Sequence, residues 1–100
     1  MRSVVIIPAR YESSRFPGKP LVKLLGKSMI IWVAELSALA VGQDNVYVAT
    51  DDERISKIVT NAGFNIVMTS KSCLTGTDRV AEAASKIKSD IYVNVQGDEP

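Results

Sequence analysis

The sequence contains no histidine and a single cysteine, Cys73. Without histidine, these residues cannot form a histidine-ligated metal site, a histidine general base or a histidine pH switch. One cysteine cannot form an internal disulfide, and it excludes a zinc site built from several cysteines. Such cysteine usage is typical of a protein that is kept reduced inside the cell, so we expect a cytoplasmic location.

A strong excess of charge is also lacking, because twelve basic and eleven acidic residues leave a net charge of +1. This balance argues against the broad positive surface that binds duplex nucleic acid or an anionic membrane. The apolar run at residues 4–7 is four residues long, whereas a signal peptide needs about 7–15 and a membrane span about 18 or more. We therefore expect neither a nucleic-acid partner nor a membrane partner.

What is present is an ordinary globular composition, with 46% apolar and 23% charged residues. Continuous β-branched runs predict strands that are covered on both faces. These runs lie at residues 4–7, 46–49, 66–68 and 91–95. Between them, apolar residues recur at helical spacing in residues 29–40, 55–62 and 80–87. This alternation predicts an α/β fold, a Rossmann-like three-layer αβα arrangement with a mainly parallel sheet.

The ends of the predicted helices carry their own signals. We assign Asp51 and Asp52 to the cap of the second helix, which Gly63 closes. Thr75, Gly76 and Thr77 precede the third helix, and two interpretations stay open there. Either Thr77 or its neighbour Asp78 is an N-cap, or the hydroxyls and free helical N–H groups bind a nucleotide.

Two segments interrupt the regular pattern. The connection from Pro8 to about Lys27 is far longer than the roughly 2–6 residues that usually join a strand to a helix, which indicates a functional loop. The last strand is followed by an acidic segment, residues 96–100. If the strands take the common order 3-2-1-4, both segments lie at one crevice, where the winding of the sheet reverses. We also infer from the open sheet edge that residues 1–100 are the N-terminal, nucleotide-binding portion of one larger domain.

The long connection is rich in cations. Arg10, Arg15 and Lys19 are opposed there only by Glu12. Arginine and lysine bind phosphate oxygens, and Ser14 adds a neutral donor. The alternative is a solvated basic loop, and charge alone does not decide between the two. The sequence completes neither a Walker A loop nor the dinucleotide-binding glycine pattern.

The acidic segment offers Asp98 and Glu99. Carboxylate oxygens are the ligands that bridge Mg²⁺ to substrate phosphates. An acidic pair in a loop is more often structural, but opposite a phosphate-binding loop a metal would relieve the repulsion between carboxylate and phosphate.

Ordered motifs add a resemblance to these observations. The motifs are IPAR from residue 7, SRFPGKPL from 14, GK from 26, ATD from 49, MT from 68, TGTDR from 75 and NVQGDEP from 94. Together they closely resemble the start of the 3-deoxy-D-manno-octulosonate (KDO) cytidylyltransferases, or CMP-KDO synthetases. The resemblance implies the nucleotide-diphospho-sugar transferase type of fold. It also implies transfer of a cytidylyl group from CTP to KDO with Mg²⁺, release of pyrophosphate, a role in lipopolysaccharide synthesis and a homodimeric full-length chain.

The resemblance also assigns roles to individual residues. Arg10 and Lys19 would bind the triphosphate and serve catalysis, with Arg15 assisting. The cytidine pocket would be lined by Pro8, Ala9, Thr75, Gly76 and Thr77. Gln96 would lie near the sugar or ribose, and Asp98 would hold Mg²⁺.

Departures from the family pattern keep some alternatives open. Ser28 stands where a proline is frequent and Cys73 where a histidine is common, which leaves room for an 8-amino analogue of KDO. A sialic acid is another possible acceptor. A CTP-binding fragment without turnover and a purely structural domain are the alternatives outside this enzyme class.

Overall fold

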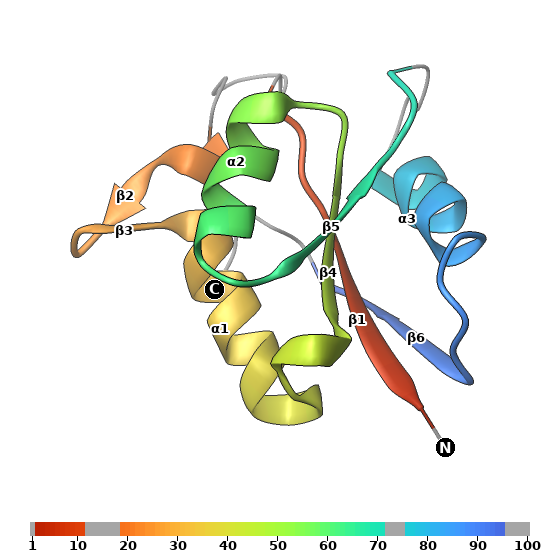
Figure 1. Ribbon diagram of the computed structural model, residues 1–100. Helices are drawn as coiled ribbons and strands as arrows, with labels where there is room; N and C mark the ends of the chain where they lie inside the picture. Colours follow the sequence, from red (N-terminus) through yellow and green to blue (C-terminus); the bar gives the residue numbers. More distant parts are fainter. Residues whose placement is uncertain (1, 12–18, 72–75, 96–100) are drawn as a thin grey trace.

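The computed structural model describes residues 2–11, 19–71 and 76–95. These residues form a parallel four-stranded sheet in the order β5-β4-β1-β6 (Figure 1). Its strands are β1 (Ser3–Pro8), β4 (Val46–Thr50), β5 (Asn65–Met68) and β6 (Ile91–Asn94). Counted along the chain, this order is 3-2-1-4. The predicted strands and the order assumed for them are therefore confirmed.

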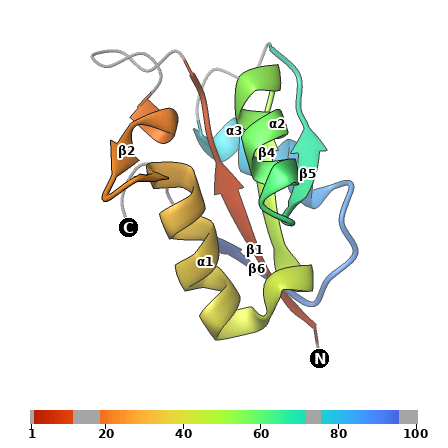
Figure 2. The ribbon, with the colours of Figure 1, turned by 60° about the vertical axis from the view of Figure 1, so that its left-hand side comes forward.

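Helices cover both faces of the sheet. Helices α1 (Met29–Val41) and α2 (Glu53–Asn61) lie on one face, and α3 (Gly76–Ala84) lies on the other (Figures 1 and 2). Successive residues of a strand point to opposite faces. Val5 and Ile7 accordingly pack in the core under α1 and α2, whereas Val4 and Ile6 pack in the core that includes Ala83 of α3. The predicted three-layer αβα arrangement is confirmed.

The start of α2 follows the prediction. The carboxylate of Asp52 accepts hydrogen bonds from the backbone N–H groups of Arg54 (2.8 Å) and Ile55 (3.4 Å), so Asp52 caps the helix. Beyond the other end, Gly63 has a φ of +88°, a conformation that glycine adopts without strain. Within the described ranges, none of the helices is long and apolar enough to span a membrane.

The start of α3 differs from the prediction. This helix begins at Gly76, so Thr77 and Asp78 lie in its first turn. The expectation that one of them is the N-cap is therefore wrong. The cap position falls on residue 75, outside the described residues.

The connection between β1 and α1 is more regular than we expected. It contains a 3₁₀ turn, η1 (Lys19–Leu21), and an antiparallel hairpin of β2 (Lys23–Leu24) and β3 (Lys27–Ser28). Leu25 and Gly26 make the turn with φ values of +54° and +79°, as two-residue hairpins require. The indole Nε1 of Trp32 in α1 donates to the Leu24 carbonyl at 2.8 Å and fixes the hairpin to the helix. The long connection predicted from the sequence is therefore present, and at this end it contains regular structure.

Strand β6 forms one edge of the sheet in the described part of the chain. Ile91, Tyr92 and Val93 keep 40–42% of their surface exposed. The strand thus presents apolar side chains to solvent, unlike β1 at the centre of the sheet, where residues 4–8 are buried.

Candidate functional site

Parallel strands bring their carboxyl ends to one edge of the sheet, where ligands bind in doubly wound folds. At this edge, the backbone N–H of Ala9 donates to the Ala49 carbonyl at 2.9 Å. The N–H of Thr69 donates to the Thr50 carbonyl, also at 2.9 Å. These bonds continue the sheet by one residue beyond β1 and β5. The residues that follow β1, β4 and β5 are therefore held next to one another.

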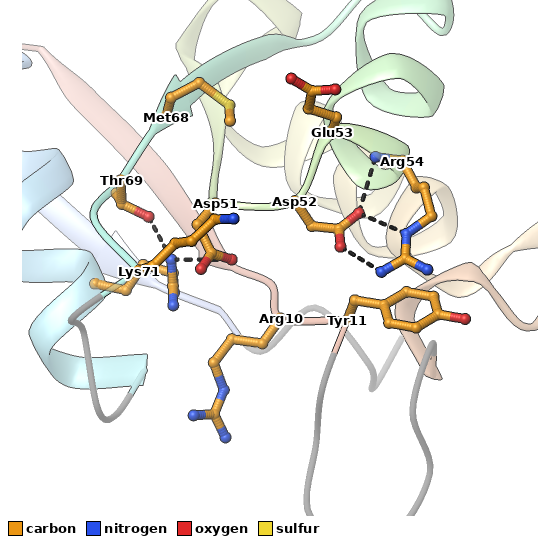
Figure 3. Close-up of a pocket in the computed structure, with 10 residues that line it drawn as sticks. Arg10, Tyr11, Asp51, Asp52, Glu53, Arg54, Met68, Thr69 and Lys71 are labelled. Carbon is orange, nitrogen blue, oxygen red and sulfur yellow. Dashed lines mark hydrogen bonds and ion pairs between the residues drawn. The ribbon is translucent and has the colours of Figure 1, made fainter.

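A cavity of about 820 Å³ lies at this edge (Figure 3). Its walls come from the segments after β1, β4 and β5 and from α3. Charged side chains dominate the lining. The cations are Arg10, Arg54, Lys71 and Arg79, and the carboxylates are Asp51, Asp52 and Glu53. A cavity of this size and polarity suits a charged small molecule.

Arg10 is the predicted phosphate-binding residue that the structure places in this cavity. Its side chain is half-buried and extends from the end of β1 away from Met68 and Glu53 (Figure 3). Lys71, which is exposed, adds a further cation from the segment after β5. Two cations that follow different strands thus line one cavity, an arrangement that favours an anionic ligand.

Asp52 and Arg54 form one wall of the cavity. Arg54 donates from Nε to Oδ1 of Asp52 at 3.1 Å and from Nη2 to Oδ2 at 2.7 Å, a bidentate ion pair. Its guanidinium carbon lies 3.2 Å from the ring centre of Tyr11, in a cation–π contact. The hydrogen bond from Arg54 lowers the pKa of Asp52 below its usual value of 3.8, although partial burial opposes this shift. Asp52 is therefore ionised at neutral pH.

Asp51 and Arg79 form the opposite wall. Nη1 of Arg79 donates to the hydroxyl oxygen of Thr69 and lies 3.7 Å from Oδ1 of Asp51. Arg79 is 1% exposed, so this is a buried cation tied to the ends of two strands. The assignment of Asp51 to the helix cap is wrong, because Asp52 makes the capping bonds and Asp51 pairs with Arg79.

Two described carboxylates of the cavity are engaged in ion pairs. Asp51 and Asp52 are each paired with an arginine. Among the described residues, no three histidine, cysteine, aspartate or glutamate side chains come close enough together to hold a metal ion. The predicted magnesium ligand, Asp98, lies outside these residues.

The other predicted site residues fall into two groups. Pro8 and Ala9 are buried at the end of β1 and are not among the residues that line the cavity. Lys19 begins η1, Gly76 begins α3, and Thr77 is exposed in the first turn of α3. The remaining ones, which lie outside the described residues, are Ser14, Arg15, Thr75, Gln96 and Asp98.

The described part of the chain reaches Val95, the residue before the acidic segment, and Tyr11 in the long connection. The backbone N–H of Val95, directly after β6, donates to the Ile6 carbonyl of β1 at 3.1 Å. The chain therefore leaves β6 beside the strand that leads to Arg10. That residues 12–18 and 96–100 share one crevice stays a prediction, because both lie outside the described residues.

Sequence reasoning missed the part of the cavity that lies away from the winding reversal. Tyr11, Arg54, Thr69 and Lys71 received no role from the sequence, although each follows the end of a strand or begins a helix at the carboxyl edge. The position of ligand sites in parallel sheets was available as a signal. The sequence prediction places the site between β1 and β6, whereas the cavity extends across β4 to β5.

A doubly wound α/β domain with a charged cavity at its carboxyl edge is of the kind that binds nucleotides there. The chain belongs to the cytidylyltransferase family, whose profile matches residues 4–100. It is 55% identical to the mitochondrial 3-deoxy-manno-octulosonate cytidylyltransferase of Arabidopsis thaliana, over 99% of this chain and 35% of that protein. It is 52% identical to the 8-amino-3,8-dideoxy-manno-octulosonate cytidylyltransferase of a Shewanella species, over 100% of this chain and 42% of that protein.

A solved structure agrees with these relatives. The CMP:2-keto-3-deoxy-manno-octonic acid synthetase complexed with CTP matches with a TM-score of 0.87 and 45% identity, over 97% of this chain and 40% of that one. This match confirms the fold type that the resemblance implied. The chain spans 35–42% of the length of these three proteins.

Proposed function

We propose that this chain supplies the CTP-binding part of an enzyme that transfers a cytidylyl group from CTP to KDO. The observation that carries the proposal is the similarity to KDO cytidylyltransferases over nearly the whole chain, at 55% and 53% identity in two of them. The matching fold of a synthetase complexed with CTP supports CTP as the nucleotide that this chain binds. The charged cavity at the carboxyl edge of the sheet is the candidate binding site for CTP.

In the proposed reaction, the anomeric hydroxyl oxygen of KDO attacks the α-phosphorus of CTP. The bond between the α-phosphorus and the oxygen that bridges to the β-phosphate breaks, pyrophosphate leaves, and the hydroxyl loses its proton. Such transfers ask little covalent work of the protein, which positions the substrates and neutralises charge. Arg10 and Lys19 would stabilise the negative charge that builds up on the departing pyrophosphate.

The proposal includes Mg²⁺, for which Asp98 is the candidate ligand. Carboxylate oxygen is the donor that Mg²⁺ prefers, and one or two such ligands suffice when phosphates complete the shell. The two described aspartates of the cavity are paired with Arg54 and Arg79 instead. When bound, the ion supplies positive charge to the substrate phosphates.

A second candidate acceptor is 8-amino-3,8-dideoxy-manno-octulosonate, the sugar in the name of the Shewanella relative. That relative is 52% identical to this chain, close to the 55% of the Arabidopsis protein. The two acceptors differ at one substituent, so contacts with that substituent decide between them.

The test is pyrophosphate release by the full-length protein with CTP and Mg²⁺. We expect release that depends on KDO, and little release with the 8-amino analogue or a sialic acid. Release with the analogue alone would transfer the proposal to that sugar. Binding of CTP without release for any of the three sugars would leave a nucleotide-binding module, and no binding would contradict the proposal.

Variants test the two charge assignments. Arg10→Ala and Asp98→Asn should each lower turnover by on the order of 10²–10³, the usual cost of removing a preorganised charge contact. Lys57→Ala is the matched control, because Lys57 is exposed on α2 outside the cavity. Turnover near that of the control in either variant would contradict that residue's assignment.

The proposed setting of the enzyme follows from the same family. We place it in the cytoplasm, where CTP is available and a lone cysteine stays reduced. Its product would serve lipopolysaccharide synthesis, and the full-length chain would form a homodimer. Light scattering on the purified protein tests the dimer directly.

A further inference from the structure

Arg79 is the largest fully buried side chain among the described residues. A buried guanidinium is costly unless its charge is paired and its donors are bonded. Nη1 has both Thr69 and Asp51 as partners, but Nε has no hydrogen-bond partner in the described part of the chain. Apolar side chains often replace such buried charges without loss of stability. The presence of this arginine therefore points to a role other than stability.

Arg79 belongs to a row of side chains that join α3 to the end of β5. The carboxylate of Glu82 accepts a hydrogen bond from the backbone N–H of Ser70 at 2.8 Å. Lys86, just beyond the helix, donates to the Met68 carbonyl at 3.0 Å. Positions 79, 82 and 86 recur at helical spacing and so share one face. This side is thus attached at two levels within α3 and at a third just beyond its end.

The three attachments differ in their surroundings. The side chain of Arg79 is 2% exposed, whereas those of Glu82 and Lys86 are 28% and 50% exposed. Arg79 lines the cavity, and the other two do not. Arg79 also reaches a second strand, because Asp51 follows β4. Its guanidinium therefore fixes the first turn of α3 relative to the ends of both β4 and β5.

We propose that Arg79 is a positioning residue for nucleotide binding. By holding the first turn of α3 on the ends of β4 and β5, it places the backbone around Gly76 and Thr77 where the nucleoside of CTP binds. This inference rests on the proposed function, in which that turn lines the cytidine pocket. Because Arg79 acts on the binding of CTP rather than on the transfer step, its loss raises the KM for CTP and leaves kcat nearly unchanged.

The experiment measures CTP affinity by calorimetry, together with kcat and the KM for each substrate, on the full-length protein. Arg79→Met keeps the volume and removes the charge and the donors. We expect its Kd and KM for CTP to rise by about tenfold to 10²-fold, since a shift of about 1 Å in a binding group has effects of this size. The KM for the sugar should stay within about threefold. Lys86→Met is the matched control, which removes an exposed attachment of α3 and should bind CTP normally.

Substitutions at Thr69 test the same contact with less risk to folding. Thr69→Ser keeps the acceptor oxygen and should bind CTP normally. Thr69→Val keeps the shape without the acceptor and should weaken CTP binding in the same direction as Arg79→Met. A lower melting temperature with unchanged CTP affinity in both Arg79→Met and Thr69→Val would overturn the inference. Equal losses in Thr69→Ser and Thr69→Val would also overturn it.

The two proposals can fail separately. If the wild-type protein binds no CTP, the proposed function fails and this inference fails with it. If the wild type binds CTP and releases pyrophosphate while the Arg79 and Thr69 variants bind CTP equally well, the inference about Arg79 alone is wrong.

Discussion

Asp51 and Asp52 are neighbours at the end of β4, yet the two arginine pairs they form differ in distance, burial and reach. Asp52 pairs at 2.7 Å with Arg54, two residues further on, whose side chain is 56% exposed. Asp51 lies 3.7 Å from Arg79, which comes from α3 and whose side chain is 2% exposed. Both carboxylates stay partly exposed, Asp52 at 15% and Asp51 at 22%, so the pairs differ mainly in the arginine, which water surrounds in the first pair and barely reaches in the second. The first pair therefore organises one helix end, whereas the second fixes one element of the fold relative to another.

The largest effect is expected from Asp51→Asn. This change leaves the buried guanidinium of Arg79 without its carboxylate partner, and losing one partner of a buried pair is strongly destabilising. Because Asp51 itself is 22% exposed, we expect a loss of about 2–4 kcal/mol in the free energy of unfolding, measured by urea denaturation of the full-length protein. Asp44→Asn, at an exposed position in η2 (Gln43–Asn45), is the control. If the Asp51→Asn and Asp44→Asn variants are equally stable, the buried pair of Asp51 and Arg79 contributes no more to stability than an exposed residue does.

A smaller effect is expected from Asp52→Ala, which removes the cap of α2. The loss of the bonds to the Arg54 and Ile55 N–H groups should cost about 0.5–2 kcal/mol in unfolding free energy. Asp52→Asn keeps a capping oxygen and loses only the ion pair. Urea denaturation should therefore find the asparagine variant more stable than the alanine variant. Equal losses would mean that the ion pair, and not the cap, stabilises this end of α2.

Tyr11→Leu tests the cation–π contact between the Tyr11 ring and Arg54, the arginine of the exposed pair. Removing the ring that faces Arg54 should lower the unfolding free energy by about 0.5–1 kcal/mol, the usual worth of a cation–π contact at an exposed site. Tyr11→Phe keeps the ring and should stay near wild type in the same denaturation experiment. A loss in the phenylalanine variant as large as in the leucine variant would assign the effect to the hydroxyl.

The smallest effect is a dependence on acid pH. The pKa of Asp52 is lowered in the folded protein, so its ionised form adds stability that is fully present above the unfolded value of 3.8. This stability disappears as the pH falls through the lower folded pKa. The difference in stability between wild type and Asp52→Asn should thus stay constant from pH 7 to pH 5 and shrink below 3.8. A difference that begins to shrink near pH 6 would implicate another group.

The layered fold could be predicted because its signals repeat over several residues. Buried β1 is a continuous apolar run, and α2 shows both its apolar spacing and its acidic cap in the sequence. The hairpin of β2 and β3 could not be found in this way, because strands of two residues show no period. Its turn depends on Leu25 in a conformation that non-glycine residues rarely adopt, which apolar patterns do not predict.

The site was predictable only in part. Arg10 stood out because it lies in an unusually long connection, and the structure places it at the cavity. The pairing of Asp51 with Arg79 depends on two elements that are far apart in the sequence and meet only through the sheet order. Acidic residues before a helix have an adequate local explanation as caps, so nothing local distinguished Asp51 from Asp52. Long-range pairings of this kind require the topology before the chemistry can be assigned.

The exposed strand β6 has a practical consequence for anyone who expresses these hundred residues alone. An edge strand with exposed apolar side chains can pair with the same strand of a second copy. Samples of the isolated polypeptide should therefore self-associate as they are concentrated, and a lysine in place of Tyr92 would make such samples easier to handle.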